Sequence, residues 1–407
     1  MASKFLICAG VVSFVTCAAV AERLEETSYV PYEDKAIQYF ETQTDEAVKK
    51  LDDRIDQGKE KLDYTPGELG YLPSLLKHLN INVDSQVLVF AQDSFQASRI
   101  SAQRPRAVYF NDDYSVGYVP HGEVYEVTAL DPKQGVIFYS LETTKAAKPS
   151  FARREVCLQC HQGGQTLGVP GLVISSQYIP AGMPAEHARG GFVTDDRTAI
   201  ADRWGGWYIS GSVGGQKHRG VMIGPDYEQR FDPAPYLSPI SDVVALMTLE
   251  HQTRMTNLIT RIGWDTRIAV GQGKLKEAEP KLNEAIEDMV GYMLFVDEAP
   301  LSGAVKGAST FSTTFPARGP KDKQGRSLRD FDLEKRLFKY PLSYMIYSKA
   351  FDSMPQWDRD RIYLRLYNVL TGKETGGKFA RLAEDDRKNV LDILRETKTN
   401  LPPYFKN

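Results

Sequence analysis

The sequence lacks an excess of either charge, and this excludes a first class of function. Lys plus Arg total 50 and Asp plus Glu total 53, so the formal net charge of the 407 residues is −3. No run of like charge forms a tail, and the chain is not basic enough to indicate a nucleic-acid partner. Hydrophobic residues account for 42% and charged residues for 25%. This ordinary balance excludes a disordered, collagenous or multi-span membrane protein.

The N-terminus has the layout of an export signal. Met1–Lys4 carries one positive charge, and residues 5–20 are apolar and small with two interruptions. Ala19-Val20-Ala21 places small residues at the −3 and −1 positions of a cleavage site, and a polar segment follows at once. The apolar stretch is shorter than the ~18–20 residues that a spanning helix needs. We therefore expect a signal peptide over 1–21, cleaved after Ala21, and a periplasmic mature protein with no membrane span.

Cysteine is scarce, and its placement is informative. Of the 4 cysteines, Cys8 and Cys17 lie within the expected signal peptide. The mature protein would keep Cys157 and Cys160, which stand in the sequence Cys-Leu-Gln-Cys-His with His161 at its end. This is the C-x-x-C-H signature of covalent c-type haem attachment. Two thiols at this spacing can add across the two vinyl groups of one porphyrin, and the adjacent imidazole can reach the iron as proximal ligand. We expect one covalent haem c.

Three other interpretations of this motif are weaker. A thioredoxin-like redox pair shares the C-x-x-C spacing, but it occurs in a βαβ context and does not need the adjacent His. A zinc site needs a fourth ligand and usually a second Cys pair, which the mature chain lacks. A disulfide across so small a loop would add little chain-entropy stabilisation. Export agrees with haem as well, since covalent attachment takes place outside the cytoplasm.

The rest of the chain predicts an α+β protein that is not a small all-α cytochrome c. Residues 22–85 form an N-terminal helical lead, with one narrow apolar stripe over Asp45–Leu62 and a helix start at Thr65-Pro66. Residues 86–237 form a β-rich region that carries the haem motif. Residues 238–407 form a mainly helical region that packs against the haem half.

Short β-branched and aromatic runs between turn residues predict antiparallel strands. These lie at 86–90, 107–110, 115–119, 124–129, 136–141, 171–178, 190–194 and 206–210. Apolar periodicity predicts helices at 241–270, 279–297, 331–351, 356–371 and 383–397. Residues 300–328 are rich in Ser, Gly, Thr and Pro without periodicity, and they predict a surface loop.

The far side of a haem iron would need its own ligand, and the sequence offers several. His251 shares one face of a predicted helix with apolar and Met residues, where an unpaired imidazole costs roughly 1–3 kcal/mol unless the iron or a hydrogen bond satisfies it. His218 lies in a glycine-rich loop that could close over a haem face. Met183 or Met222 could supply a thioether sulfur. A vacant or water-ligated position is the remaining alternative.

A dense aromatic segment, Arg203-Trp204-Gly205-Gly206-Trp207-Tyr208, is a second candidate feature. Trp204 and Trp207 could form a wall over the porphyrin, and Arg203 could pair with a propionate. Equally, the aromatic rings could fill a core beside a strand. Asp112 and Asp113 could be an acid–base pair or metal ligands, but Asn-Asp-Asp between two strands is typical of a hairpin turn.

Together these segments resemble an uncharacterised family of exported bacterial proteins with a single haem c motif, described as cytochrome c domain-containing. The resemblance extends from about Leu72 to Phe405 and rests on Ser94–Gln96, Ile100-Ser101, Pro105–Asp113, Cys157–His161, Thr166–Gly171, Phe192–Asp195, Arg203–Tyr208, Leu249–Gln252 and Asp392–Lys398. The family usually reads Arg-His-Met-Gly-Asn where this chain has Lys217-His218-Arg219-Gly220-Val221, which argues against a ligating Met there. His218 and His251 both fall on family positions, and the resemblance implies haem and export without any particular reaction.

The expected function is that of a periplasmic monohaem c-type cytochrome that transfers single electrons. Its partner would be a redox protein or a small-molecule electron donor or acceptor. The alternative is a haem enzyme or small-ligand sensor with an exchangeable distal site, which the length of the chain favours. A di-haem peroxidase is excluded, because it needs two C-x-x-C-H motifs and the chain has one. A haem that mainly staples two halves together is a third alternative.

Overall fold

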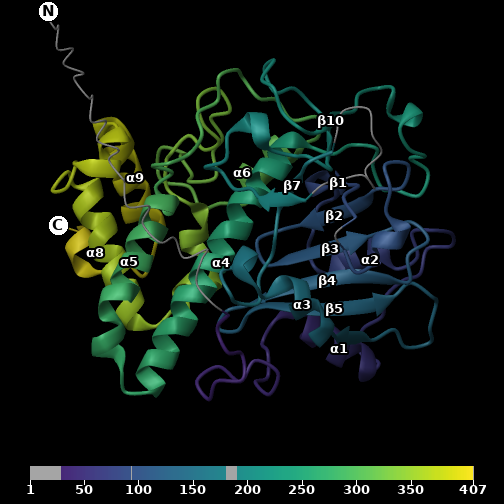
Figure 1. Cartoon of the computed structure of the whole chain (residues 1–407), viewed down its shortest axis with the longest axis horizontal. Coiled ribbons are helices and arrows are strands. Elements are labelled where there is room, and N and C mark those ends of the chain that lie inside the picture. Colours follow the sequence, from purple (N-terminus) through teal and green to yellow (C-terminus); the bar gives the residue numbers. More distant parts are fainter. Residues whose placement is uncertain (1–28, 93, 180–189, 407) are drawn as a thin grey trace, which may run out of the picture.

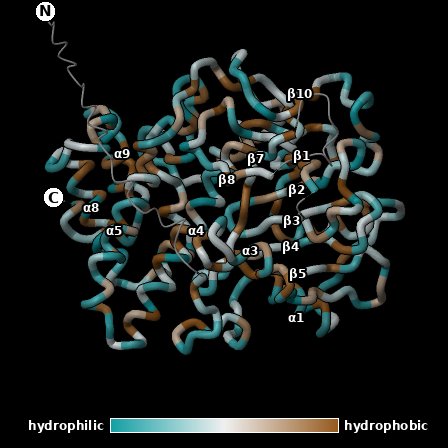
Figure 2. The backbone as a smooth tube through the Cα atoms, viewed as in Figure 1, coloured by the Kyte–Doolittle hydropathy of each residue, from teal (hydrophilic) through white to brown (hydrophobic). Residues whose placement is uncertain are grey.

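The structure is a computed structural model that describes residues 29–92, 94–179 and 190–406. The expected signal peptide and Met183 lie outside these residues. The described chain has a β-rich N-terminal half and a helical C-terminal half, which lie side by side (Figure 1). The predicted α+β class is therefore confirmed. Strands and central helices carry most of the hydrophobic residues, while hydrophilic residues follow the outer turns (Figure 2).

The N-terminal half is built on an antiparallel sheet of 6 strands in the order β1-β2-β3-β4-β5-β6. Each strand pairs with the next along the chain, as expected for consecutive hairpins. In the β2–β3 turn, the Asn111 side-chain oxygen accepts hydrogen bonds from the backbone N–H groups of Asp113 and Tyr114, so Asn-Asp-Asp is a hairpin turn. The strands are β1 Val87–Val89, β2 Arg106–Phe110, β3 Tyr114–Tyr118, β4 Val124–Asp131, β5 Gly135–Glu142 and β6 Phe151–Arg153.

One face of this sheet is covered by the N-terminal segment through a set of tyrosines. The helices of this segment are α1, Ala47–Asp56, and α2, Leu72–His78. Side chains alternate along a strand, which places four strand tyrosines on one face. Their hydroxyls hydrogen bond to the segment 46–71, and they are Tyr114, Tyr118, Tyr125 and Tyr139. From residue 29 on, the predicted 22–85 lead is thus a covering layer that contains α1 and α2, and the predicted helix start at Thr65 is instead a turn bridged to Gly70.

The opposite face of the sheet, which we call the inner face, turns toward the helical half. It carries Val87 and Val89 of β1 and Phe110 of β2, which pack in one hydrophobic core with α4, Val243–Gly271. Helix α4 begins at Asp242, whose side chain accepts hydrogen bonds from two backbone N–H groups of the first turn. Most of its 29 residues are buried, and it runs between the sheet and the outer helices (Figure 1).

The outer helices complete the C-terminal half. They are α5 Leu275–Met293, α6 Phe311–Ala317, α7 Lys349–Asp352, α8 Gln356–Leu370 and α9 Glu384–Thr397. The helix predicted over 331–351 is wrong, because Phe331 and Phe338 pair in a β-bridge with stacked rings and Leu333 adopts a positive φ of 61°. Within the predicted loop 300–328, residues 311–317 form α6. None of the helices in the described ranges is long and apolar enough to cross a membrane.

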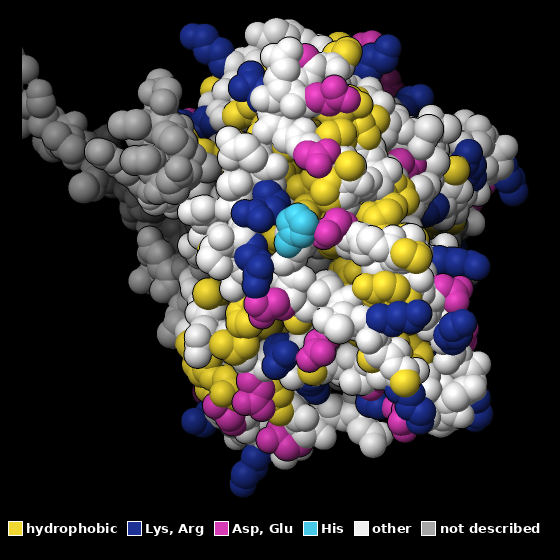
Figure 3. Space-filling view, turned by 90° about the vertical axis from the view of Figure 1, so that its right-hand side faces the viewer, with side chains coloured by type: hydrophobic (Ala, Val, Ile, Leu, Met, Phe, Trp, Pro, Cys, Tyr) yellow, Lys and Arg dark blue, Asp and Glu magenta, His cyan; other side chains and the backbone are white. Residues whose placement is uncertain are grey.

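Smaller elements connect the two halves. Helix α3, Leu158–His161, follows β6, and β7, Ser175–Gln177, pairs with β8, Gly191–Val193. Strand β9, Tyr208–Ile209, runs parallel to β10, Val221–Met222. On the face seen in Figure 3, basic and acidic side chains are interspersed with hydrophobic ones.

The contact between α4 and α8 contains a buried carboxyl group. Asp358 of α8 is 0% exposed and accepts a hydrogen bond of 2.7 Å from the Thr266 hydroxyl of α4. Its other carboxyl oxygen, Oδ2, is buried without a hydrogen-bond partner among the described residues. Burial raises the pKa of Asp358 to about 7. The folded protein therefore holds this proton more tightly than the unfolded chain does.

We predict that the Asp358→Asn variant removes a pH dependence of stability. The stabilisation from the protonated carboxyl is complete below the unfolded pKa near 3.8 and is lost as the pH rises through about 7. Each pKa unit corresponds to about 1.4 kcal/mol, so the wild type should lose a few kcal/mol over this range relative to the variant. Urea unfolding at pH 5 and pH 8 measures the difference. Asp360→Asn, an exposed change on the same helix, is the control, and equal pH slopes for wild type and Asp358→Asn would contradict the prediction.

Candidate functional site

The C-x-x-C-H motif lies on a helical turn that leaves the sheet. Cys157 ends a short 3-10 turn after β6, and Cys160 lies in α3. Residues three apart on a helical turn project to the same side, so the two thiols share one side of it. Both cysteines are free thiols, with Cys160 exposed and Cys157 half-buried. Burial raises the pKa of Cys157 to about 11, with the charge of Glu126 adding to the effect.

The His161 ring is held by a backbone carbonyl. Its Nδ1 lies 3.0 Å from the carbonyl oxygen of Gly171, and the ring packs on Phe138 of β5 with centroids 4.8 Å apart. A carbonyl oxygen can only accept, so Nδ1 carries a proton and donates it to the Gly171 carbonyl. Ligating histidines commonly donate their other ring N–H to a carbonyl in this way. Nδ1 is therefore held by the backbone, and Nε2 is the ring nitrogen that a metal would have to use.

These donors fit a haem rather than a bare metal ion. Two thiols on one side of a helical turn and an adjacent imidazole oriented through its Nδ1 are the kinds of group that covalent haem attachment uses. In the part of the chain that the structure describes, no group of three or more His, Cys, Asp or Glu side chains could hold a metal ion. If a haem were attached here, the two thiols would bond its porphyrin and His161 its iron.

His251 does not fit the expected role of haem ligand. It is 0% exposed, its Nδ1 lies 2.8 Å from an Asp196 carboxyl oxygen, and its Nε2 lies 2.8 Å from the Ser343 hydroxyl. The rings of Tyr292 and Phe295 stack on the imidazole. Because both ring nitrogens are engaged inside the core, the structure gives His251 a structural role instead.

Asp196, His251 and Ser343 have the carboxylate–imidazole–hydroxyl order of a catalytic triad. All three are buried, with Ser343 at 0% exposure. The Ser343 hydroxyl also accepts a hydrogen bond from the backbone N–H of Met345 and thereby caps a helical turn. A substrate has no route to this hydroxyl, so the three residues form a hydrogen-bond network of the core.

Arg203 belongs to the same network and does not face a haem propionate. Its guanidinium donates to a Glu250 carboxyl oxygen at 3.1 Å and to the backbone carbonyls of Asp196 and Thr198. Arg203 is 2% exposed and Glu250 is 0% exposed. Burial raises the pKa of Glu250, while the guanidinium of Arg203 opposes that rise. Every hydrogen bond that Arg203 makes is internal, which corrects the propionate expectation.

The two tryptophans of the aromatic segment fill the core between the sheet and α4. Trp204 is 1% exposed and Trp207 is 4% exposed, and both belong to the core cluster that contains α4. The Trp207 indole N–H donates to the Ser175 carbonyl at 2.8 Å, and its backbone bridges to Val89 of β1. Trp204 and Trp207 are therefore core residues, and in this structure they do not form an exposed wall for a porphyrin.

His218 packs on Trp204, with ring centroids 5.5 Å apart. Burial lowers the pKa of His218, and its Nδ1 is buried without a hydrogen-bond partner among the described residues. The segment that holds it is anchored at β1, whereas His161 packs on β5. Four strand spacings separate β1 from β5, about 19 Å, while one iron binds each nitrogen at about 2 Å. His218 and His161 therefore pack on different parts of the sheet, His218 on Trp204 and His161 on Phe138.

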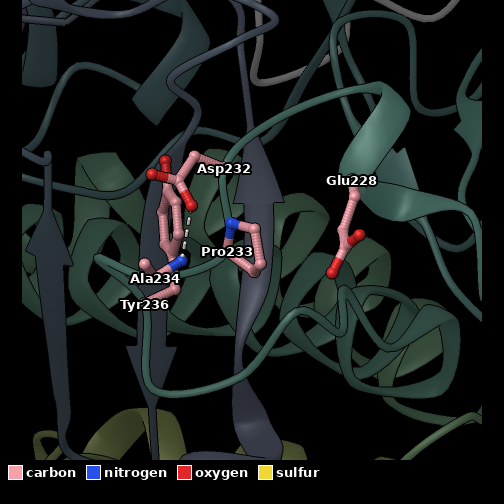
Figure 4. Close-up of a pocket in the computed structure, with 5 residues that line it drawn as sticks. All are labelled: Glu228, Asp232, Pro233, Ala234 and Tyr236. Carbon is pink, nitrogen blue, oxygen red and sulfur yellow. Dashed lines mark hydrogen bonds between the residues drawn. The ribbon is translucent and has the colours of Figure 1, made fainter.

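Two other polar sites also serve the fold. Asp112 pairs with Arg329, which is 5% exposed, and so ties the β2–β3 turn to the helical half. A surface pocket of about 640 Å³ is lined by Glu228, Asp232, Pro233, Ala234 and Tyr236 (Figure 4). The Asp232 carboxylate accepts from the Ala234 backbone N–H at 3.0 Å within its own turn. The carboxylates of Glu228 and Asp232, the two acidic residues of this pocket, do not point toward one another (Figure 4).

Sequence reasoning missed two groups that contact His161 of the motif, Phe138 and the Gly171 carbonyl. Phe138 was predicted within a strand, and alternation alone does not say which element covers it. Gly171 follows the motif by ten residues, and which carbonyl folds back on a histidine depends on the loop between them. Neither carried a sequence signal beyond its own residue type.

We predict that the hydrogen bonds of His251 are coupled in stability. The His251→Leu variant leaves the buried Asp196 carboxylate unpaired, which should cost about 3–5 kcal/mol of unfolding free energy. Ser343→Ala should cost about 1–3 kcal/mol, and the double variant should cost less than the sum of the two. Urea unfolding of the four proteins measures this. His121→Leu at an exposed position is the control, and strict additivity would refute the coupling.

We compared the chain with protein-family models, with curated protein sequences and with solved structures. No family model, curated protein or solved structure matches it. Its function is therefore argued from the geometry of the motif and its surroundings.

Proposed function

We propose that this protein is an exported, periplasmic monohaem c-type cytochrome that transfers single electrons. Cys157 and Cys160 would hold the haem through thioether bonds, and His161 would be its proximal ligand. The observation that carries the proposal is the His161 Nδ1 contact of 3.0 Å with the Gly171 carbonyl, next to two free thiols. When bound, the haem would supply an iron that cycles between Fe(III) and Fe(II).

The residues beside the motif support a porphyrin on the inner face of the sheet. Phe138 contacts His161 from this face and would pack beside the proximal ligand. Arg106 lies on the same face toward β2, where its Nη1 donates to Glu126 at 2.9 Å. Its Nε is buried without a partner among the described residues, so Arg106 has a donor left for a propionate. We therefore propose Arg106, and not Arg203, as the residue that would pair with a haem propionate.

The exposure of the motif supports exchange with a partner. Cys160 is exposed, and the apolar side chain of Val156 beside Cys157 is 43% exposed. The porphyrin edge attached at these thiols would then lie near the surface. A redox protein or a small-molecule donor or acceptor could approach that edge without any opening of the fold. We include the partner class in the proposal on this ground.

A second candidate function is a haem enzyme or small-ligand sensor with an exchangeable distal site. The observation in its favour is that neither of the two histidine candidates, His251 and His218, contacts His161. His251 is engaged at both ring nitrogens, and His218 is anchored four strands away. Met183 remains a candidate by sequence alone, since it lies outside the described residues.

We predict that the purified protein contains one covalently bound haem that depends on the motif. Acid–acetone extraction should leave the haem attached, and the pyridine haemochrome spectrum should give one haem c for each chain. The Cys157→Ser/Cys160→Ser double variant should lose covalent haem, since no other thiol remains in the mature chain. His161→Ala should abolish the low-spin spectrum, whereas His121→Ala, an exposed change, should leave it intact. Haem retained by the double variant would overturn the proposal.

Carbon monoxide separates the two candidate functions. An electron carrier with two protein ligands should give sharp low-spin α and β bands on reduction, unmoved by carbon monoxide. A Soret band that shifts with carbon monoxide would establish an exchangeable iron site. A haem enzyme or small-ligand sensor would then replace an electron carrier as the proposed function.

A further inference from the structure

We propose that Asn257 of α4 is a positioning residue for His161, acting through the Gly171 carbonyl. The inference rests on the proposed haem function, since it concerns the ligand strength of His161. It assigns a role to a helix residue 96 positions beyond the motif, which the haem signature itself does not include.

The side-chain amide of Asn257 hydrogen bonds to the backbone of Leu172, the residue after Gly171, through both its oxygen and its nitrogen. Its side-chain oxygen accepts from the Leu172 N–H at 3.1 Å, and its NH₂ group donates to the Leu172 carbonyl at 2.8 Å. Asn257 is 2% exposed, so these two bonds are shielded from competing water. Two hydrogen bonds to one residue fix both the position and the rotation of that peptide segment.

Gly171 lies against this amide with no room for a side chain. A Cβ added there would stand 2.3 Å from the Asn257 Oδ1 and 3.1 Å from the Cβ of Thr166. Gly171 also donates its N–H to the His161 carbonyl at 2.9 Å while its own carbonyl accepts from the His161 ring. The amide of Asn257, the peptide of Gly171 and the imidazole of His161 therefore form one continuous contact.

The helix that supplies Asn257 is a rigid support. Helix α4 is buried along most of its length, and one turn further on Arg261 donates to the Leu167 carbonyl of the same loop. The loop 167–172 is thus held to α4 at two points, four residues apart on one helix face. The carbonyl that orients His161 cannot shift without breaking one of them.

This support has a consequence for the iron. A stronger hydrogen bond from Nδ1–H makes the imidazole a better electron donor, and that stabilises Fe(III) over Fe(II). Loss of the Asn257 bonds would free the Gly171 carbonyl, weaken the Nδ1 bond and raise the midpoint potential. We expect at least about a tenfold shift in the Fe(II)/Fe(III) ratio at a fixed ambient potential, which corresponds to about 59 mV for one electron.

The test compares two buried amides of the same helix. Asn257→Leu removes both bonds to Leu172 at similar volume. Gln252→Leu is the matched control, because Gln252 is 7% exposed and makes one bond to the Asn111 carbonyl and one to the Tyr344 hydroxyl. Redox titration of the full-length haem-loaded proteins should give a raised potential for Asn257→Leu and the wild-type potential for Gln252→Leu. The Fe–His stretching frequency of the reduced proteins should fall in Asn257→Leu alone.

Asn257→Ser and Asn257→Asp keep the test decisive if the Leu variant fails to fold. Asp retains the acceptor for the Leu172 N–H, so its potential should lie between those of the wild type and the Ser variant. A haem-loaded Asn257→Ser with the potential and Fe–His frequency of the wild type would overturn the positioning role alone. A wild-type protein without covalent haem would overturn the proposed function, and the positioning role with it.

Discussion

A buried polar group must find a partner, and α4 carries a series of such groups through the centre of the molecule. Glu250, His251, Gln252, Asn257 and Thr266 are all buried on this one helix. Each reaches a segment that is distant in sequence, from the sheet hairpin at Asn111 to α8 at Asp358. An unsatisfied partner would cost roughly 1–3 kcal/mol, so these bonds specify how the two halves meet. The proposed haem site depends on the same requirement, through Asn257.

The sequence predicts features that depend on neighbouring residues better than it predicts contacts between residues that are distant along the chain. Alternation and turn residues predicted β1 to β5 within about two residues, because both signals lie within the strand itself. The short strands β6 and β10 were missed. The helix predicted over 331–351 failed because aromatic packing between Phe331 and Phe338 outweighed periodicity.

The candidate site shows the same division. The sequence identified Cys157, Cys160 and His161 as a candidate site because the three lie in a motif of five adjacent residues. For His251 the sequence argument stated that a buried imidazole needs a partner, and this is correct, but the partners are Asp196 and Ser343. Both lie more than 50 positions away, and no periodicity identifies them. Arg203 and Trp204 likewise have chemistry suited to a haem, and only the fold shows that they face the core.

The half-buried position of Cys157 has a consequence for the reactivity of its free thiol. A thiol with a pKa of about 11 is ionised in only about one molecule in ten thousand at pH 7. Disulfide exchange proceeds through the thiolate, so a chain already folded would oxidise slowly at this residue. Reactive C-x-x-C pairs depend on the opposite, a lowered pKa. Under oxidising conditions the fold itself would therefore slow the loss of this thiol to disulfide formation.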